Sequence, residues 1–344
     1  MIDAVTPAWF HPAQLAFKPR YEWAFGERID HPETTARAES ILAALRDADR
    51  FAVEEPPPVP PGTLSAQHNG NLLALYRTAS ALPEGETFYP TVFPKRDQVQ
   101  ADPTRISHAG AFCFDAGTPL SSQTWEAARW SASCAWAAAR ALKKRRLPLT
   151  YALSRPPGHH ATGKAFGGYC YLNNAAIAVS ALLRGARVTV LDIDVHHGNG
   201  TQSLFYRNPR VQVVSIHEHP DACFPYFAGF PNETGAGAGS GTTLNVTEAA
   251  GCDGPRYMEL LERQALPAIR AFAPDYLVLS AGLDTYALDP VGHFQLTTDD
   301  LREVGERIGR LGLPTVAVQE GGYHTEHLGR NAVALLDGLR TTLG

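Results

Sequence analysis

From residue 123 to the C-terminus, short apolar segments alternate with longer helical patterns, and this alternation constrains the fold most strongly. The segments expected as strands cover residues 149–154, 187–194, 211–217, 276–282 and 314–322. The segments expected as helices cover residues 124–146, 173–183, 256–272 (kinked near Pro267), 298–311 and 331–343. Strands that are apolar along nearly their whole length are buried on both faces. The sequence therefore predicts an α/β fold with a central parallel β-sheet flanked by helices on both faces.

The first 120 residues have a less regular pattern. Residues 33–49 predict a helix, whereas the prolines of 54–62 exclude a helix interior. Residues 82–122 form a long irregular segment, but their aromatic side chains favour an ordered functional loop over a mobile excursion. No composition break marks a linker after residue 123, so we expect one domain over 1–344.

Composition excludes several classes of protein. The chain is 44% hydrophobic and 19% charged, as in an ordinary globular enzyme, and its net charge of −5 does not favour nucleic acid or an anionic membrane. Five cysteines without a CxxC pair argue against a disulfide framework or a thiolate metal site. Neither a membrane span nor a secretory signal is evident, so we expect a cytoplasmic protein.

Polar side chains follow four of the expected strands, where α/β sheets bind their ligands. In the extended run Asp192-Ile-Asp194-Val-His196, alternate side chains share one face. Asp194 and His196 could therefore hold one ion, with Asp284 from another strand end as third ligand and an open position for water. Carboxylates and imidazole suit Zn²⁺, but also Fe²⁺, Co²⁺ or Mn²⁺. The alternative for the run alone is a salt-bridged pair of buried carboxylates.

Two further strand ends carry groups suited to acid–base chemistry. His159 and His160 follow a Pro-Pro-Gly turn and could act as general base, general acid or ligand, or could be solvated turn residues. Tyr323 follows Glu320-Gly-Gly and could donate to an oxyanion, or simply pack. The glycine-rich segment 235–242 lacks the Lys-Ser/Thr of a phosphate loop and is interpreted as a flexible turn.

Together these motifs resemble the arginase/deacetylase superfamily and, more narrowly, the histone deacetylase family. The resemblance rests on RPPGHH (155–160), GGYCYLNNAAIA (167–178), LDIDVHHGNGTQ (191–202), GLDTYALDP (282–290) and EGGYH (320–324), with HPETTARAESI (31–41) similar to the family's N-terminal helix. The segments 82–122 and 219–242 look most like those of the bacterial acetylpolyamine amidohydrolases. The resemblance implies the single-domain arginase/deacetylase fold, with 82–122 as an insertion near the channel mouth or a dimer interface.

The resemblance also implies a role for each matching residue. Asp194, His196 and Asp284 match the zinc ligands, and His160 matches the general base and acid. His159 matches its tandem partner, bonded to Asp192. Asn199 stands where many relatives carry an aspartate partner of the second histidine, which should lower the basicity of His160. Tyr323 matches the tyrosine that polarises the acetyl carbonyl. The tunnel is matched by Gly168, whose carbonyl meets the substrate amide, and by the aromatic walls Tyr169 and Phe224.

The implied cofactors are one Zn²⁺ per chain and structural K⁺ or Na⁺. One monovalent site matches main-chain oxygens of Asp192, Asp194 and His196 with Ser215, and the other matches Phe205, Asn208 and Val211. The implied partners are a small acetylated amine and a second copy of the chain, as homodimer or higher oligomer. Neither nucleic acid nor a membrane is expected.

The implied function is zinc-dependent hydrolysis of acetylated amines, with N-acetylpolyamines as the leading substrates. Ser107 falls about where one channel-mouth acid of the polyamine enzymes is expected, Asp115 is a candidate substitute, and Val291 lacks a gatekeeper carboxylate. The alternative is an acetyl-lysine protein deacetylase or a broad amide and ester hydrolase of the same fold. The complete set of site residues argues against a catalytically silent binding protein.

Overall fold

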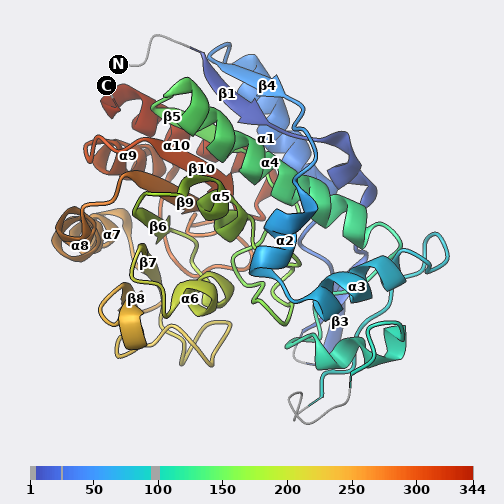
Figure 1. The fold of residues 1–344 in the computed structure, drawn as a ribbon. Helices are drawn as coiled ribbons and strands as arrows, with labels where there is room; N and C mark the ends of the chain where they lie inside the picture. The colour runs from blue at the N-terminus through green and yellow to red at the C-terminus, as the bar shows by residue number, and fades with distance from the viewer. Residues whose placement is uncertain (1–4, 25, 94–100, 344) are drawn as a thin grey trace.

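The five apolar segments become neighbouring strands of one sheet in the computed structural model, which describes residues 5–24, 26–93 and 101–343 (Figure 1). The sheet has eight parallel strands in the order β4-β1-β5-β10-β9-β6-β7-β8. They span β1 Thr6–Trp9, β4 Phe51–Glu54, β5 Leu149–Ala152, β6 Val188–Asp192, β7 Val211–Glu218, β8 Thr243–Glu248, β9 Tyr276–Ala281 and β10 Thr315–Gln319. The antiparallel strands β2 (Tyr21–Ala24) and β3 (Glu27–Asp30) form a separate hairpin. The predicted parallel α/β architecture is confirmed.

The predicted helical segments correspond to α1, α4, α5, α7 with α8, α9 and α10, whereas α2, α3 and α6 were not predicted. They span α1 Thr35–Asp47, α2 Pro61–Gln67, α3 Gly70–Ala79, α4 Thr124–Arg145, α5 Asn174–Leu182, α6 Asn199–Phe205, α7 Gly254–Leu260, α8 Leu266–Phe272, α9 Thr298–Gly309 and α10 Thr325–Thr342. Short 3₁₀ turns occur at η1 Pro12–Ala16, η3 Ile106–Ala111 and η4 Gly237–Gly239, and a π-helical turn, η5 Leu261–Ala265, joins α7 to α8. None of these helices has both the length and the apolar character required to cross a membrane.

The structure gives more exact bounds for two of the predicted helices, and packing explains them. The interruption expected near Pro267 is the π turn, after which Pro267 occupies the first turn of α8, where its missing N–H is tolerated. Helix α10 begins at Thr325 instead of residue 331, so Gly329 lies inside it. A Cβ atom at Gly329 would lie 2.3 Å from the Ser40 carbonyl oxygen, so this glycine allows α10 to approach α1 closely.

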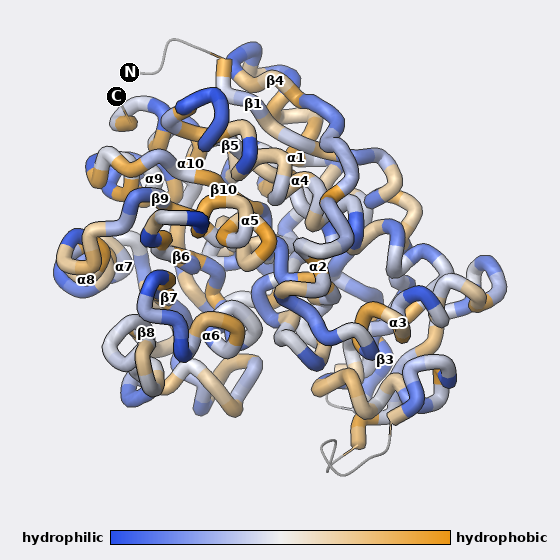
Figure 2. The backbone as a smooth tube through the Cα atoms, viewed as in Figure 1, coloured by the Kyte–Doolittle hydropathy of each residue, from blue (hydrophilic) through white to orange (hydrophobic). Residues whose placement is uncertain are grey.

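Hydrophobic side chains cover both faces of the sheet. On one face, Leu191 and Leu279 pack in a core with α1, α7, α8, α9 and α10. On the other face, Val190 and Val278 pack against α4 and α5. Figure 2 shows apolar stretches along α5 and the neighbouring central strands and hydrophilic colour on many outer turns. Because successive strand residues point to opposite faces, both faces need apolar residues, which explains the near-continuous apolar strands.

Strands β1, β4 and β8 and the β2–β3 hairpin were not predicted from the sequence. Strands β1 and β4 have four residues each, too few to show a period, and β4 and β8 lie at the sheet edges. The segment 54–62 contains no helix interior, because α2 begins at Pro61, where proline is favoured.

Parts of the segment 82–122 have defined local contacts, although residues 94–100 lie outside the described residues. Phe88 and Leu120 exchange backbone hydrogen bonds of 2.7 and 2.8 Å, and η3 lies between them in sequence. This segment contributes to a third hydrophobic cluster with α2 and α3, beside the sheet (Figure 1).

The close packing of α9 against α10 generates a stability prediction. A Cβ atom at Gly338 would lie 2.0 Å from the Arg302 carbonyl oxygen, whereas a Cβ atom at Gly62 would meet nothing within 4 Å. We expect Gly338→Ala to lower the free energy of unfolding by about 1–3 kcal/mol through overpacking. The control Gly62→Ala should leave it unchanged or raise it by up to about 1 kcal/mol. Urea denaturation midpoints check this prediction, and equal midpoints for the two variants would contradict it.

Candidate active site and metal centre

Four adjacent strands, β5, β10, β9 and β6, deliver the predicted polar residues to one edge of the sheet. The loops that follow them are joined by carboxylates that accept backbone N–H hydrogen bonds. Gly158 donates to Glu320 Oε2 at 2.6 Å, Val195 to Asp284 Oδ1 at 3.0 Å and Gly321 to Asp194 Oδ2 at 2.8 Å. The expected convergence of these strand ends is therefore present.

Asp194, His196 and Asp284 form a group that fits a metal ion. One ligand atom from each lies within 4.8 Å of the others, and the two carboxylates are fully buried. His196 Nδ1 is 3.1 Å from Asp194 Oδ1 and 3.2 Å from Asp284 Oδ2. Ligand bonds of about 2.0–2.1 Å at tetrahedral angles place neighbouring ligand atoms about 3.3 Å apart. Two buried carboxylates around one imidazole thus have both the spacing and the negative charge that a divalent cation requires.

Glycines leave the space that this group needs. A Cβ atom at Gly282 would lie 2.2 Å from Asp194 Oδ2, and one at Gly321 would lie 2.1 Å from Asp284 Oδ2. A side chain at either position would displace a carboxylate. The Gly residues in the motifs GLD and EGG are therefore required by the close approach of the backbone to the ligand set.

The two adjacent histidines lie in different electrostatic surroundings. His159 Nδ1 is 3.0 Å from Asp192 Oδ2, and its Nε2 is 3.8 Å from Asp194 Oδ2. Burial lowers the pKa of His159, but the carboxylates of Asp194 and Asp192 outweigh it and raise that pKa to about 10. Its ring is 4.0 Å from that of His160. Burial, together with the positive charges on His159 and His196, holds the pKa of His160 well below its usual value.

Asn199 lies beside His160, as the sequence motif implied. His160 Nδ1 donates to Asn199 Oδ1 at 2.7 Å, so neutral His160 presents Nε2 without a proton. Asn199 is the first residue of α6, and the backbone of Gly198 also packs close to Asp192. The arrangement gives one charged imidazole and one neutral imidazole side by side.

Tyr323 is held in place by two residues to which the sequence analysis assigned no role. The Arg37 guanidinium lies 4.5 Å over the Tyr323 ring and donates to the Gly322 carbonyl at 2.5 Å, while Glu33 anchors it at 2.9 Å. Asp289 Oδ2 accepts the Tyr323 backbone N–H at 2.6 Å. Burial raises the pKa of the Tyr323 phenol well above its usual value, so the hydroxyl remains a donor. The buried pair Glu33–Arg37 has the i,i+4 spacing of an ordinary surface pair, so the sequence did not distinguish it.

Aromatic side chains and a glycine enclose the approach to these groups. The Phe224 ring lies 4.9 Å from His160, edge to face, and the Tyr169 ring lies 5.9 Å from Tyr323. Gly168 has φ +57°, and a Cβ atom there would lie 2.2 Å from His160 Cδ2. The three residues predicted to line a tunnel therefore border the histidines and the phenol.

Comparison with known proteins points to the same family as the sequence motifs. A model of the histone deacetylase domain matches residues 31–339. The chain belongs to the histone deacetylase family. It is 40% identical to an acetylpolyamine amidohydrolase of Burkholderia pseudomallei, with 98% of this chain and 99% of that protein covered. It is 41% identical to acetylpolyamine amidohydrolase 1 of Pseudomonas aeruginosa, with 89% and 90% covered.

Solved structures of this family have the same fold. The crystal structure of an acetylpolyamine aminohydrolase from Burkholderia pseudomallei gives a TM-score of 0.91 at 40% identity, with 97% of this chain and 98% of that chain covered. The HD domain of HDA15 gives 0.82 at 28% identity, with 98% and 94% covered. The recognition of the deacetylase fold from its motifs is confirmed.

Asp115 was predicted as a candidate acid for the channel mouth. Its carboxylate accepts hydrogen bonds from the protein itself. Its Oδ1 accepts the backbone N–H groups of Gly117 and Thr118 at 3.1 and 2.9 Å. Its Oδ2 accepts the Thr118 hydroxyl at 2.9 Å and the backbone N–H of Gly168. The carboxylate thus joins the segment 82–122 to the tunnel loop. Its contact with a substrate ammonium stays a prediction.

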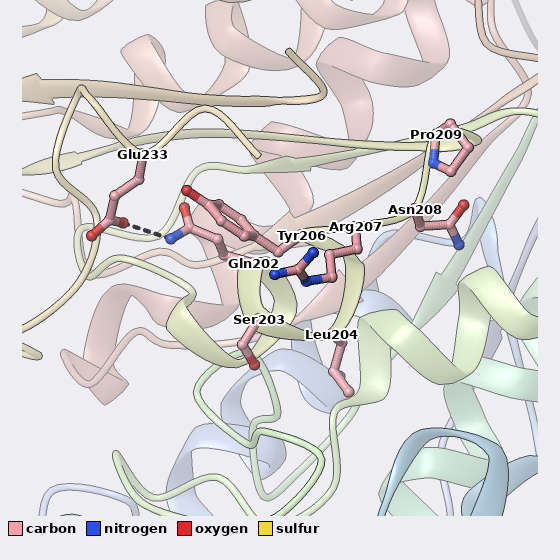
Figure 3. Close-up of a pocket in the computed structure, with 8 residues that line it drawn as sticks. All are labelled: Gln202, Ser203, Leu204, Tyr206, Arg207, Asn208, Pro209 and Glu233. Carbon is pink, nitrogen blue, oxygen red and sulfur yellow. Dashed lines mark hydrogen bonds between the residues drawn. The ribbon is translucent and has the colours of Figure 1, made fainter. Parts of the chain in front are cut away.

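The residues predicted for monovalent cations are also grouped locally. Asp192 pairs with Ser215 in the register of β6 and β7, and the Phe205 carbonyl accepts the Asn208 N–H at 2.8 Å. A hollow of about 760 Å³ opens beside Asn208 at the end of α6 (Figure 3). Residues 202–204, 206–209 and 233 line it, so it is separate from the catalytic set.

The metal centre predicts ligand-dependent stabilisation. Adding Zn²⁺ to chelator-treated protein should raise the Tm, because an ion that binds only the folded state stabilises it by about 4 kcal/mol at a thousand times its Kd. Asp284→Asn should remove most of this rise, whereas Asp221→Asn at an exposed position should retain it. Differential scanning calorimetry with and without the ion is the measurement. A full rise in the Asp284 variant would contradict the assignment.

Glu320 predicts a pH dependence of stability. Burial raises the pKa of Glu320 to about 8, with His159 opposing and Asp192 adding to the shift. Because this pKa is above that of the unfolded chain, the folded state binds the extra proton, and stability should fall as pH rises from about 4.5 to about 8. Glu320→Gln should reduce this fall in chelator-treated protein. Urea midpoints at pH 5 and pH 8 measure it, and an unchanged difference between them would refute the prediction.

Proposed function

We propose that this protein is a zinc-dependent amidohydrolase that removes acetyl groups from small N-acetylated amines, with N-acetylpolyamines as its main substrates. The observation that carries this proposal is the convergence of three residues that could hold a metal ion, a neutral histidine and a phenol, bordered by the rings of Tyr169 and Phe224. Similarity to proteins named acetylpolyamine amidohydrolase over nearly the whole chain supports the choice of substrate.

Each residue of the site has its own role in the proposed amide hydrolysis. A bound Zn²⁺ would lower the pKa of a water molecule and polarise the acetyl carbonyl. His160 Nε2, which is unprotonated, takes a proton from the attacking water and later gives it to the nitrogen of the leaving amine. His159 remains charged between Asp192 and Asp194 and stabilises the negative charge that develops nearby.

Tyr323 and the channel walls act on the substrate itself. The Tyr323 hydroxyl donates to the carbonyl oxygen as it gains charge, and Arg37 and Asp289 hold the phenol in position. Tyr169 and Phe224 hold the alkyl stem of the amine and exclude water. The Gly168 carbonyl accepts the substrate amide N–H.

A second candidate function is deacetylation of acetyl-lysine in peptides. It is supported by 37% identity over 244 residues to histone deacetylase 8 of Arabidopsis thaliana, which covers 65% of this chain. Relative kcat/KM values for N-acetylputrescine and an acetyl-lysine peptide separate the two candidates. The polyamine proposal requires the diamine to be the better substrate.

The proposal includes two structural features. Potassium or sodium binds near Asp192 and Ser215 and at the turn Phe205–Asn208–Val211. The chain acts as a homodimer or higher oligomer through the segment 82–122, whose described parts lie beside the channel loop.

Loss of the Tyr323 hydroxyl predicts a defect in catalysis without a defect in metal binding. Tyr323→Phe should lower kcat by about 10²–10³, because one oxyanion donor is lost. The Zn²⁺-dependent rise in Tm should be unchanged, since Tyr323 is not among the ligand group. Steady-state hydrolysis of N-acetylputrescine and calorimetry on the same preparations check both parts. Wild-type activity in this variant would contradict the proposed role.

A further inference from the structure

Cationic side chains gather at the edge of the sheet opposite the candidate active site. The parallel strands β5, β6 and β7 begin at this edge, and the turn that precedes each of them is rich in lysine or arginine (Figure 1). Figure 2 shows hydrophilic colour beside the labels of these three strands. We call the six exposed cations of these turns the basic edge; they are Lys144, Arg145, Arg146, Arg184, Arg187 and Arg210.

Contacts between the turns make the basic edge one continuous surface. At the end of α4, Lys143 Nζ donates to the Leu182 carbonyl at 2.8 Å. In the turn before β7, the Arg210 guanidinium donates to the Leu183 carbonyl at 3.4 Å. The turn before β6 therefore lies between the other two and contacts both.

The positive charge of the basic edge is poorly compensated. Arg145 pairs with Glu54 at 3.2 Å, but within the described ranges the other five cations form no ion pair. Asp275 also lies at this edge, where its Oδ2 accepts the Arg187 backbone N–H at 2.8 Å. Because the chain as a whole has a net charge of −5, this surplus is local, and it creates a positive potential that the total charge conceals.

A hollow of about 270 Å³ opens between the end of α4 and the starts of β9 and β10. Tyr276, Leu142 and Pro148 are among its apolar walls, and Lys143 and Arg146 add two cations to its lining. Lys143 Nζ lies 5.7 Å from the centre of the Tyr276 ring. Pockets for drug-sized ligands have volumes of about 300–1,000 Å³, so this hollow fits a single ring system.

These features suit a phosphate polymer better than a membrane. Arginine binds phosphate through two parallel N–H groups, and arginine dominates the basic edge. A membrane surface is bound by apolar side chains that protrude and insert, whereas the apolar residues here line a hollow. Among the described residues, the exposed large hydrophobic side chains all lie outside the basic edge: Val5, Trp23, Ile29, Tyr226, Phe227 and Leu288.

The length of the basic edge matches its charge. Strands β5 and β7 lie four positions apart in the sheet, which is about 19 Å at a spacing of about 4.8 Å. A stacked strand of nucleic acid has one phosphate per 3.4 Å or so, and about five phosphates cover that length. Five is also the number of basic-edge cations without an ion pair.

We propose that the basic edge binds single-stranded nucleic acid, with phosphates on its cations and one base in the hollow beside Tyr276. Such strands are bound by a combination of cations that follow the backbone and aromatic side chains that contact bases. Binding here is independent of the proposed amide hydrolysis, because the metal ligands lie at the opposite edge of the sheet.

The test measures binding of the full-length protein to a labelled single-stranded DNA oligonucleotide of about 20 nucleotides by fluorescence anisotropy at several salt concentrations. Five phosphate contacts predict that log Kd rises with log salt with a slope of about 3.5. Replacing both Arg184→Gln and Arg210→Gln should lower that slope by about 1.4 and weaken binding by about 10- to 100-fold. The control Arg105→Gln removes an exposed cation far from the edge and should change neither quantity.

A second variant tests the hollow separately from the charge. Tyr276→Leu retains an apolar side chain but removes the ring, so it should weaken binding by about 5- to 100-fold and leave the salt slope unchanged. Hydrolysis of N-acetylputrescine should be the same in all these variants and in wild-type protein, which also shows that they are folded.

Three results would overturn the proposal. The first is the absence of oligonucleotide binding by wild-type protein at about 100 µM and low salt, where even non-specific binding is measurable. The second is equal affinity for a DNA duplex together with no effect of Tyr276→Leu. The third is sedimentation with phosphatidylserine vesicles that the double arginine variant abolishes, without oligonucleotide binding, which would make the basic edge a membrane-binding surface.

Discussion

Four buried acidic side chains meet at the ends of three neighbouring strands, and the rest of the site depends on how their negative charge is compensated or, for Glu320, removed by a proton. Asp192, Asp194, Asp284 and Glu320 are all almost completely buried. Buried charge is costly unless it is paired. Backbone N–H groups from loops after β5, β6 and β10 supply part of the compensation, and His159 supplies a positive charge. The remaining deficit lies between Asp194, His196 and Asp284, where a dication fits. The way in which the sheet gathers acids thus produces a group of residues that could hold a dication.

The same balance explains why two adjacent histidines have different chemistry. His159 lies between two carboxylates and retains a proton, whereas His160 faces a neutral amide and the charges on its neighbours. One imidazole stabilises charge, and the other is free to accept a proton. An asparagine at position 199 suits this division, because an aspartate there would draw a proton onto His160. A dication held by Asp194, His196 and Asp284 would take the place of the proton on His196, so positive charge would remain beside His160 and favour its neutral form.

Much of the central sheet and of the chemistry was predictable because both follow local rules. Parallel strands buried on both faces have nearly continuous apolar sequences, and residues after their carboxyl ends converge. A two-residue period placed Asp194 and His196 on one face, but by itself it left a salt-bridged carboxylate pair as the alternative to a metal site. The N-terminal strands β1 and β4 could not be predicted, because each has only four residues, one of them Pro7 or Glu54, and they pair with segments far away in sequence. Arg37 and Glu33 have the spacing of a surface pair, and only tertiary packing places the Arg37 guanidinium against the Tyr323 ring with Glu33 as its partner. Asp289 lies in a recognised motif, but its backbone partners come from another loop.

The predicted residues lie mostly at the strand ends, and the residues that were not predicted lie mostly elsewhere. These two groups also differ in function. Chemistry lies on the strand ends, where geometry is fixed by the sheet and few arrangements are possible. The channel walls lie on loops held by side chain to backbone hydrogen bonds, such as those that Asp115 makes with Gly168 and Thr118. The β2–β3 hairpin contacts the Tyr169 hydroxyl through Glu22, and Tyr89 stacks on Tyr21 of the hairpin at 4.6 Å. A change in the hairpin or in the segment 82–122 can therefore alter which amine enters without moving the metal ligands, so that substrate choice can change while the catalytic machinery stays intact.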